Sequence, residues 1–438
     1  MKYLARILLA VACVLVAGVA RSNELAPGDT LSRENWELAK DLLPAEILRH
    51  YQSGDYSSAI VRWNEGQYHW SQAFLAATGR NAGSLDLDPQ GSIMEKATGR
   101  RPAYIFGFPF PTVTAEDPQA AIKILWNHYS YWWNNGNTHI VAELNWISPS
   151  GVDRSVTQNV YFLYYQGQPR EYIPADNPND LLMQFVAVTE KPADLYGTNA
   201  LTWRYRDPEK RDAVWAYVPA LRRTRAVSPN NRSDGFLGSD MSQDDGPFFD
   251  GKPEDFTWKV VGERDLLRFV DPFSLAGEFK RVELPDGGWR DVFKRAPIVG
   301  FQDPRWKGLP WAPLTFGLAR RRCWIIEGTP KDSYYLFGKI QLTIDRETYH
   351  GAYNRKFDWK GELLNTYSVA AALSARVRDR DDYYDAGALV SYQGAENIKL
   401  NRATVITIPL DGGDPPSDRR IQLDPGFFSL QTLARLGK

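Results

Sequence analysis

A cluster of arginines followed by a cluster of aspartates is the charged group in this chain best suited to binding. A guanidinium group can form two parallel hydrogen bonds to a phosphate or a carboxylate. If the fold contains an apolar trough, arginines at its rim would therefore bind the phosphate or carboxylate of a lipid. Alternatively, the arginines form ion pairs with the aspartates and hold the loop between the two clusters against a sheet. We favour the pairing; both roles are compatible if the loop is a lid whose ion pairs open when a ligand enters. The residues are Arg222, Arg223 and Arg225, and Asp240, Asp244 and Asp245.

An aromatic β-hairpin stands directly before the arginines. Residues 201–206 alternate apolar and polar side chains, the two-residue period of a half-buried strand. Pro208 favours a type I turn at 207–210. The return strand, 213–218, is apolar on both faces and must be covered on both, by core on one side and by another element, a partner or a ligand on the other. We predict that Trp203, Tyr205, Trp215 and Tyr217 contact a ligand.

Motifs for catalysis and for metal binding are sparse. The five histidines show no HxH, HExxH or Cys/His spacing, and neither a G-x-S-x-G elbow nor a P-loop is present. The carboxylates of 379–385 lack the EF-hand pattern, and we interpret this run and residues 411–416 as surface turns. A carboxylate pair for glycoside hydrolysis stays open, because its members can lie far apart in sequence. We predict no catalytic residues, no bound metal and no cofactor.

Residues 1–22 have the pattern of a secretory signal peptide. Lys2 and Arg6 precede an uncharged run over 7–20, and small residues at its end suit cleavage. That run is shorter than the roughly 20 residues of a membrane helix, which disfavours a retained anchor. The residues before Cys13 match a lipoprotein signal poorly. We therefore predict export to the periplasm, with or without association with the outer membrane.

Composition limits the class of partner. Lys and Arg number 52 against 53 Asp and Glu, a formal net charge of −1, so the chain is not built to neutralise a nucleic acid. Fifteen Trp and 22 Tyr favour interfaces and ligand grooves, because these side chains combine an apolar body with a polar group. Cleavage would leave Cys323 as the only cysteine, so a core rather than a disulfide must stabilise the fold. We interpret Cys323 as a buried strand residue.

Helical periodicity is confined to a few segments. Residues 34–43 carry apolar side chains at helical spacing, and Pro44 begins a second short turn. Asp117 and Pro118 form the start of a longer helix that is apolar nearly all round. We expect this helix to be mainly core within a curved sheet. Its ligand-contacting candidates are Trp126 and Trp133.

The remainder has mainly the pattern of β-strands joined by short turns. These segments are rich in aromatic and β-branched residues, and an antiparallel sheet of so many strands tends to curl around an apolar trough. We predict a mainly β fold, with residues 23–438 as a single large domain that has an N-terminal helical segment and a long loop at 228–255. Strands are expected over 138–148, 155–165, 182–190, 198–206, 213–227, 256–262, 321–328, 335–345, 347–358, 388–393 and 402–409.

The central stretch also resembles the signature of a proteobacterial family of secreted proteins of unknown function, and that of outer-membrane lipoprotein-sorting-like proteins. The signature is a W-x-Y-x-P-A-L-R-R-x-R run followed by G-S-D and an acidic pair. The resemblance implies a LolA/LolB-type fold: an unclosed antiparallel β-barrel with a few helices packed in its concave face, whose members carry lipid moieties through the periplasm. Fold alone does not fix function. The matching positions are Trp215, Tyr217, Pro219, Ala220, Leu221, Arg222, Arg223, Arg225, Gly238, Ser239, Asp240, Asp244 and Asp245, with weaker matches at 258–262, 322–327 and 344–348.

Three functions are compatible with these features. We favour a non-enzymatic carrier of a hydrophobic ligand, lipid or lipid-like, that works in the periplasm or at the outer membrane. Its partners would include an inner- or outer-membrane component of a lipid export or uptake system. An integral outer-membrane β-barrel is disfavoured by the basic C terminus at 433–438, since such barrels usually end in an aromatic residue. The third possibility is a secreted hydrolase acting on lipid or glycan.

Overall fold

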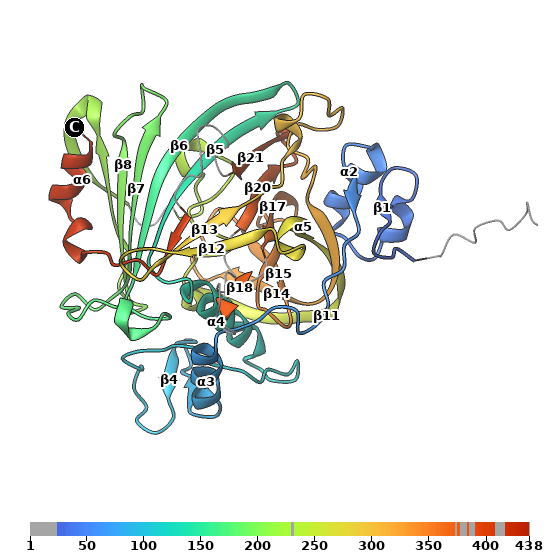
Figure 1. Ribbon diagram of the computed structural model, residues 1–438. Coiled ribbons are helices and arrows are strands. Elements are labelled where there is room, and N and C mark those ends of the chain that lie inside the picture. Colours follow the sequence, from blue (N-terminus) through green and yellow to red (C-terminus); the bar gives the residue numbers. More distant parts are fainter. Residues whose placement is uncertain are drawn as a thin grey trace, which may run out of the picture.

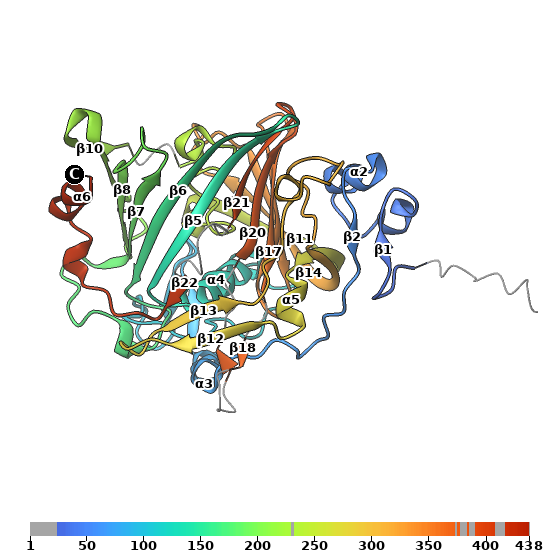
Figure 2. The same ribbon diagram turned by 45° about the horizontal axis from the view of Figure 1, so that its top comes forward.

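The fold is built on one large sheet of sixteen strands (Figure 1). The computed structural model describes residues 24–228, 232–372, 375–376, 383–384, 390–407 and 417–437. Within these residues every pairing of the sheet is antiparallel except one, in which Val270 pairs with Ala371. Long strands arch over the molecule in Figure 2. The predicted mainly β fold with a large, curved antiparallel sheet is confirmed, whereas the predicted signal peptide lies outside the described residues.

The strands of the sheet follow one main path with one branch. In hydrogen-bonded order, the main path is β10 (Arg223–Val227), β9 (Ala213–Val218), β8 (Asn199–Tyr205), β7 (Leu181–Lys191), β6 (Gly151–Tyr164), β5 (Thr138–Ser148), β21 (Arg402–Thr407), β20 (Val390–Asn397), β17 (Leu363–Ala371), β11 (Phe256–Val270), β14 (Gly317–Pro330), β15 (Lys339–Asp345) and β16 (Gly351–Phe357). The branch is β22 (Ser417–Arg419), β13 (Trp289–Phe293) and β12 (Phe279–Glu283).

The smaller elements lie around this sheet. Two-stranded sheets are formed by β1 (Thr30–Leu31) with β2 (Ser58–Ala59), β3 (Leu85–Leu87) with β4 (Ile93–Glu95), and β18 (Ala375–Arg376) with β19 (Tyr383–Tyr384). The α-helices are α2 (Ala45–Ser53), α3 (Gln72–Asn81), α4 (Ala120–Trp133), α5 (Pro272–Leu275) and α6 (Leu430–Leu436). Short 3-10 turns are η1 (Trp36–Ala39), η2 (Arg170–Tyr172), η3 (Pro219–Leu221), η4 (Phe236–Gly238), η5 (Pro253–Asp255), η6 (Gly300–Gln302) and η7 (Pro425–Phe427).

Strand β5 is the fork of the sheet. Its second half, from Glu143 to Ile147, pairs with β21, while its first residues, from Thr138 to Ile140, pair with β22 on the same edge. Its other edge pairs with β6 along almost its whole length. Strand β5 therefore joins the meander of strands β6, β7, β8, β9 and β10 both to the rest of the main path, through β21, and to the branch, through β22. It places the start of the branch beside that meander.

Helix α4 is the buried helix that the sequence predicts. Twelve of its fourteen residues are buried, and its apolar side chains share a core with residues of β14, β15 and β17. Trp126 Nε1 donates to the carbonyl of Gly91 at 2.8 Å, which satisfies the indole in this apolar surrounding. The helix begins at Ala120, slightly after the predicted start, and Asp117 caps the preceding turn by accepting from the backbone N–H of Gln119 at 2.8 Å.

The sequence predicts the strands better than the helices. The turn expected at 207–210 joins β8 to β9 as antiparallel neighbours. The predicted helix over 34–43 is only the 3-10 turn η1, and a helix of nine residues, α2, follows Pro44 instead. Helix α3 and strands β12, β13 and β17 were not among the expected elements. Cys323 is fully buried on β14, as expected.

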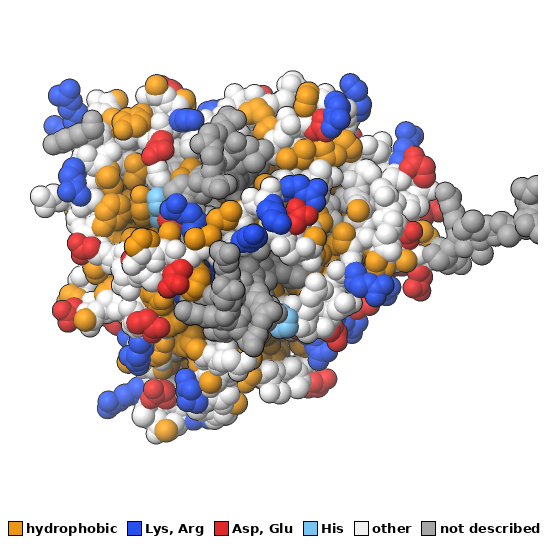
Figure 3. Space-filling model, viewed as in Figure 1, with side chains coloured by type: hydrophobic (Ala, Val, Ile, Leu, Met, Phe, Trp, Pro, Cys, Tyr) orange, Lys and Arg blue, Asp and Glu red, His pale blue; other side chains and the backbone are white. Residues whose placement is uncertain are grey.

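On the surface, charges of both signs are interspersed. In Figure 3, Lys and Arg side chains alternate with Asp and Glu around the face that is drawn, with separate groups of hydrophobic side chains between them. This distribution agrees with the formal net charge of −1. Figures 1 and 2 place α6 beside β8 at one end of the molecule and α2 with β1 at the other.

A buried carboxylate ties together β11, β14 and β15. Arg321 Nε donates to Asp345 Oδ2 at 2.8 Å, and Arg268 Nη1 lies 3.4 Å from the same oxygen. The backbone N–H groups of Glu347 and Thr348 donate to Asp345 Oδ1 at 3.0 Å each. Burial alone would raise the pKa of Asp345, but the two guanidinium groups and these hydrogen bonds outweigh it and lower the pKa to about 2.

Asp345 makes stability depend on acid pH. Its folded-state pKa lies below the unfolded value, so the ionised group stabilises the fold above about pH 4, and this contribution disappears as the pH falls towards about 2. We expect Asp345→Asn to have a lower unfolding free energy than the wild type above about pH 4. This difference should decrease by about 2 kcal/mol as the pH falls towards about 2. Urea unfolding at several pH values measures it, with the exposed Asp176→Asn as control. A pH-independent difference would contradict the account.

Candidate functional site

An apolar cavity of about 430 Å³ lies against one face of the meander β5 to β9. Strands β5 to β9 form one wall of the cavity, which we call the floor, and the register of these strands determines which side chains line it. Side chains alternate between the two faces of a strand, so directly opposed residues on neighbouring strands share a face. Phe162 of β6 lies opposite Phe185 of β7, which lies opposite Thr202 of β8. The complete row is Thr138, Phe162, Phe185, Thr202 and Val214, and the next row is Ile140, Val160, Ala187, Ala200 and Ala216.

The loop at residues 232–250, the cover loop, forms the opposite wall of the cavity. Phe236, Leu237, Met241 and Pro247 of this loop line the cavity, and Trp132 of α4 contributes a further aromatic ring. The Trp132 indole is oriented by a hydrogen bond from its Nε1 to the Tyr164 hydroxyl at 2.8 Å. The floor and the cover therefore both contribute apolar side chains to the cavity, as in sites that bind hydrophobic molecules.

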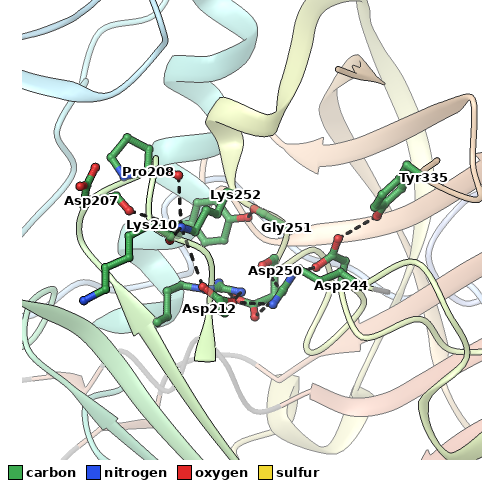
Figure 4. A network of polar contacts seen from close by, with 12 residues as sticks. Asp207, Pro208, Lys210, Asp212, Asp244, Asp250, Gly251, Lys252 and Tyr335 are labelled. Atoms are coloured by element: carbon green, nitrogen blue, oxygen red, sulfur yellow. Dashed lines mark hydrogen bonds and ion pairs between the residues drawn. The ribbon is translucent and has the colours of Figure 1, made fainter. Parts of the chain in front are cut away.

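A network of buried charges attaches the cover loop to the floor (Figure 4). Arg204 of β8 donates to Asp212 Oδ2 at 3.1 Å through both Nε and Nη2, and to Asp250 Oδ1 at 2.8 Å. Arg232 of the cover loop donates to Asp212 Oδ2 at 2.6 Å and ion-pairs with Asp244. Burial alone would raise the pKa of Asp212, but Arg204 and Arg232 outweigh it and lower that pKa. Each guanidinium thus faces at least two carboxylates.

Two further side chains, Tyr335 and Lys252, join this network by hydrogen bonds. Tyr335, in the turn between β14 and β15, donates from its hydroxyl to Asp244 Oδ2 at 2.8 Å. Lys252 Nζ donates to the carbonyl of Lys210 at 2.6 Å and lies 3.9 Å from Asp212 Oδ1. Burial lowers the pKa of Lys252 and raises that of Tyr335. The network therefore joins the β8–β9 hairpin, the cover loop and the β14–β15 turn.

Two more carboxylates of the cover loop are anchored elsewhere in the sheet. Asp240 accepts from Arg402 Nε at 3.0 Å, close to the start of β21. Asp245 Oδ1 lies 2.6 Å from Lys356 Nζ of β16, and both side chains are almost completely buried, at 0% and 1% exposure. Burial raises the pKa of Asp245 and lowers that of Lys356, so each needs the other to stay charged. Ion pairs therefore connect the cover loop to three parts of the fold: the β8–β9 hairpin, β21 and β16.

The predicted pairing of the β10 arginines with the loop aspartates is wrong. Asp240, Asp244 and Asp245 do form ion pairs, but with Arg402, Arg232 and Lys356. Arg222, Arg223 and Arg225 are exposed at the edge of the sheet, where Arg222 has φ +49° between η3 and β10. Their proximity in sequence to the aspartates misled the prediction, because the true partners lie on strands of other parts of the chain or, for Asp244, within the loop itself.

The predicted aromatic ligand contacts lie mostly away from the cavity. Trp203, Tyr205 and Tyr217 are on the other face of the hairpin and pack with α6 and the residues before it. Trp203 Nε1 donates to the carbonyl of Phe428 at 2.9 Å. Trp215 is among the residues lining the cavity, but its ring packs edge-on against Trp203, at 5.5 Å between centroids. The expectation that both faces of the hairpin need a cover holds, with α6 covering the aromatic one.

On α4 it is Trp132 that lines the cavity, whereas the predicted Trp126 and Trp133 are buried in the core at 8% and 4% exposure. Sequence reasoning also missed Arg204, Arg232 and the alanines of the floor. Arg204 did carry a signal, since it is a charged residue on the polar side of a strand otherwise rich in aromatics. The small residues Ala200 and Ala216 carry none, although they leave the space that the cavity occupies.

A family model described as protein of unknown function, DUF1329, matches residues 30–287. The chain belongs to this family. The matched range contains the aromatic hairpin and the cover loop, which confirms the resemblance to a family of unknown function. No curated protein matches this DUF1329 chain.

Several solved structures are similar to this DUF1329 chain at low sequence identity. A domain described as that of an outer membrane lipoprotein-sorting protein from Vibrio parahaemolyticus is 16% identical, with a TM-score of 0.45 over 72% of this chain and 98% of that one. A DUF1329 family protein from Desulfovibrio piger is 16% identical, with a TM-score of 0.44 over 71% and 96%. A LolA superfamily protein from Nitrosomonas europaea is 10% identical, with a TM-score of 0.39 over 73% and 100%.

No helix within the described residues is both long enough and apolar enough to cross a membrane. No group of three or more His, Cys, Asp or Glu side chains in those ranges is placed to hold a metal ion. The acidic runs at 379–385 and 411–416, interpreted as surface turns, fall almost wholly outside the described residues.

The pair of Asp245 and Lys356 provides a test of how firmly the cover loop is held. Lys356→Met leaves Asp245 buried without its cation, so we expect a loss of about 3 to 5 kcal/mol in unfolding free energy. The double variant Lys356→Met with Asp245→Asn should recover most of that loss, because no charge is then left unpaired. Chemical denaturation measures both, with the exposed Lys360→Met as control. Equal stability of Lys356→Met and the control would show that the pair does not hold the loop.

Proposed function

We propose that this DUF1329 chain binds a hydrophobic molecule, lipid or lipid-like, in the cavity between the β5–β9 floor and the cover loop. The observation that carries the proposal is that apolar side chains of the floor line an internal cavity and are not fully covered by protein. On the cavity face, Phe162, Phe185 and Val214 are only half-buried. A row of uncovered apolar side chains on the inside of a folded protein favours an apolar occupant.

The size and chemistry of the cavity support the same proposal. At about 430 Å³ it falls within the roughly 300 to 1,000 Å³ typical of small-molecule sites. Most of its lining surface is apolar, and some of its polar groups are engaged with one another, as in the network of Arg204, Arg232 and Asp250. Binding through apolar contact needs no reacting group, so we propose a carrier rather than an enzyme.

A carrier also accords with the leader that we predict over residues 1–22. Cleavage of such a leader would release the chain into the periplasm, where a hydrophobic molecule must be shielded from water to cross between the two membranes. We propose that the chain takes up or delivers its ligand at a membrane, through an inner- or outer-membrane transport component. Association with the outer membrane is part of this proposal.

Filling the cavity tests ligand binding directly. Ala200→Trp adds an indole to the middle of the floor, so we expect affinity for the neutral fluorescent probe N-phenyl-1-naphthylamine to fall by about tenfold or more. Ala226→Trp is the matched control, because Ala226 is exposed on β10 and pairs with Trp215, away from the floor rows. Titration of the probe and its displacement by 1-hexadecanol measure the effect. The proposal fails if the wild-type chain does not bind the probe, or if both variants bind it as the wild type does.

A further inference from the structure

Arg419 lies at one end of the cavity floor. It belongs to β22, where it pairs with Thr138 of β5, so it continues the row that runs through Phe162, Phe185 and Thr202. It is among the residues that line the cavity, and its side chain is only 4% exposed. An almost completely buried guanidinium thus terminates a row whose other members are Phe162, Phe185, Val214 and two threonines.

The bonds of Arg419 leave part of its guanidinium group for another partner. Its Nε donates to Asp291 Oδ2 at 2.5 Å. Asp291 is shared, since Arg281 Nε donates to its Oδ1 at 2.7 Å. Within the described residues, Nε is the one nitrogen of Arg419 with a recorded hydrogen bond or ion pair. Asp291 therefore orients Arg419 through one nitrogen, while the two terminal nitrogens keep the fork that matches a carboxylate or phosphate.

The other arginines at the cavity are already neutralised. Arg204 and Arg232 also line it, but each faces at least two of the carboxylates Asp212, Asp244 and Asp250. An anion placed beside them would meet these carboxylates as well as the guanidinium groups. Coulomb repulsion at such short range makes that corner of the cavity unfavourable for a negative charge. Arg419 is the cation of the cavity best placed to receive an anion.

The dimensions of the floor indicate the shape of a fitting ligand. Between β22 and β9 the row crosses five strand spacings, which amounts to about 24 Å at about 4.8 Å per spacing. Apolar side chains predominate along it, with threonine hydroxyls at Thr138 and Thr202. A molecule that follows the row from Arg419 would therefore be long, narrow and apolar, with a polar group at one end.

We propose that the ligand is a single-chain anionic amphiphile, whose carboxylate binds the terminal nitrogens of Arg419 while its hydrocarbon chain lies along the floor towards Val214. This inference rests on the proposed function and adds the charge, the orientation and the residue that recognises it. A bidentate, charge-assisted contact in a water-poor site is stronger than a neutral hydrogen bond, so it selects an acid over an alcohol of the same chain length.

A comparison of two probes of equal chain length tests the inference without any mutation. We expect the wild-type chain to bind hexadecanoate at least about tenfold more tightly than 1-hexadecanol, below their aggregation concentrations, in displacement titrations. Acetate should not compete at matched concentration, because the hydrocarbon chain supplies most of the affinity. Equal binding of acid and alcohol would overturn the inference and leave the proposed function intact, whereas binding of neither would overturn both. Full competition by acetate would indicate a site for free anions and would also overturn it.

Two arginine variants then locate the selectivity. Arg419→Gln should remove the preference for hexadecanoate and leave the affinity for 1-hexadecanol unchanged within about twofold. Arg225→Gln is the matched control, because Arg225 pairs with Ala216 on the floor side of β10 at the far end of the sheet and is exposed. Retention of the preference in Arg419→Gln, or its loss in Arg225→Gln instead, would contradict the assignment of the anion to Arg419.

Discussion

The buried charges that hold the cover loop are the constraint on which the rest of this structure depends. A carboxylate that is removed from water without a cation costs several kcal/mol, so Asp244 and Asp245 of the loop must stay beside Arg232 and Lys356. Through Asp212, Arg232 is tied in turn to Arg204 in the floor. These pairs set the position of the loop, and its apolar side chains consequently face the meander across the cavity.

The cavity follows from an imbalance between two faces of one sheet. Helix α6 and the residues before it cover the aromatic face of the β8–β9 hairpin, where Leu201 is fully buried. On the opposite face the floor has small residues, such as Ala200 and Ala216, and the cover loop is held too far away to fill the space. Apolar surface is thereby left for a ligand. The buried ion pairs of the cover loop oppose a collapse of the loop into the cavity.

Strand periodicity made most of the sheet predictable, since residues 138–148 coincide with β5 and the turn at Pro208 joins β8 to β9. The site was less predictable for two physical reasons. Aromatic residues favour burial of any kind, and Trp203 finds it under α6 rather than against a ligand. Ion pairs also depend on the register of distant strands, and no local pattern relates Asp245 to Lys356 or Asp240 to Arg402. The arginines nearest in sequence were therefore the wrong partners.

The central claim is that the β5–β9 floor is the surface on which this chain holds a hydrophobic molecule. A crystal structure of the protein grown with 1-hexadecanol tests it most directly. We predict electron density for the hydrocarbon chain along the row of Phe162, Phe185 and Thr202, with the cover loop in the position described above. An ordered hexadecanol bound elsewhere, with this row covered by protein side chains, would contradict the claim.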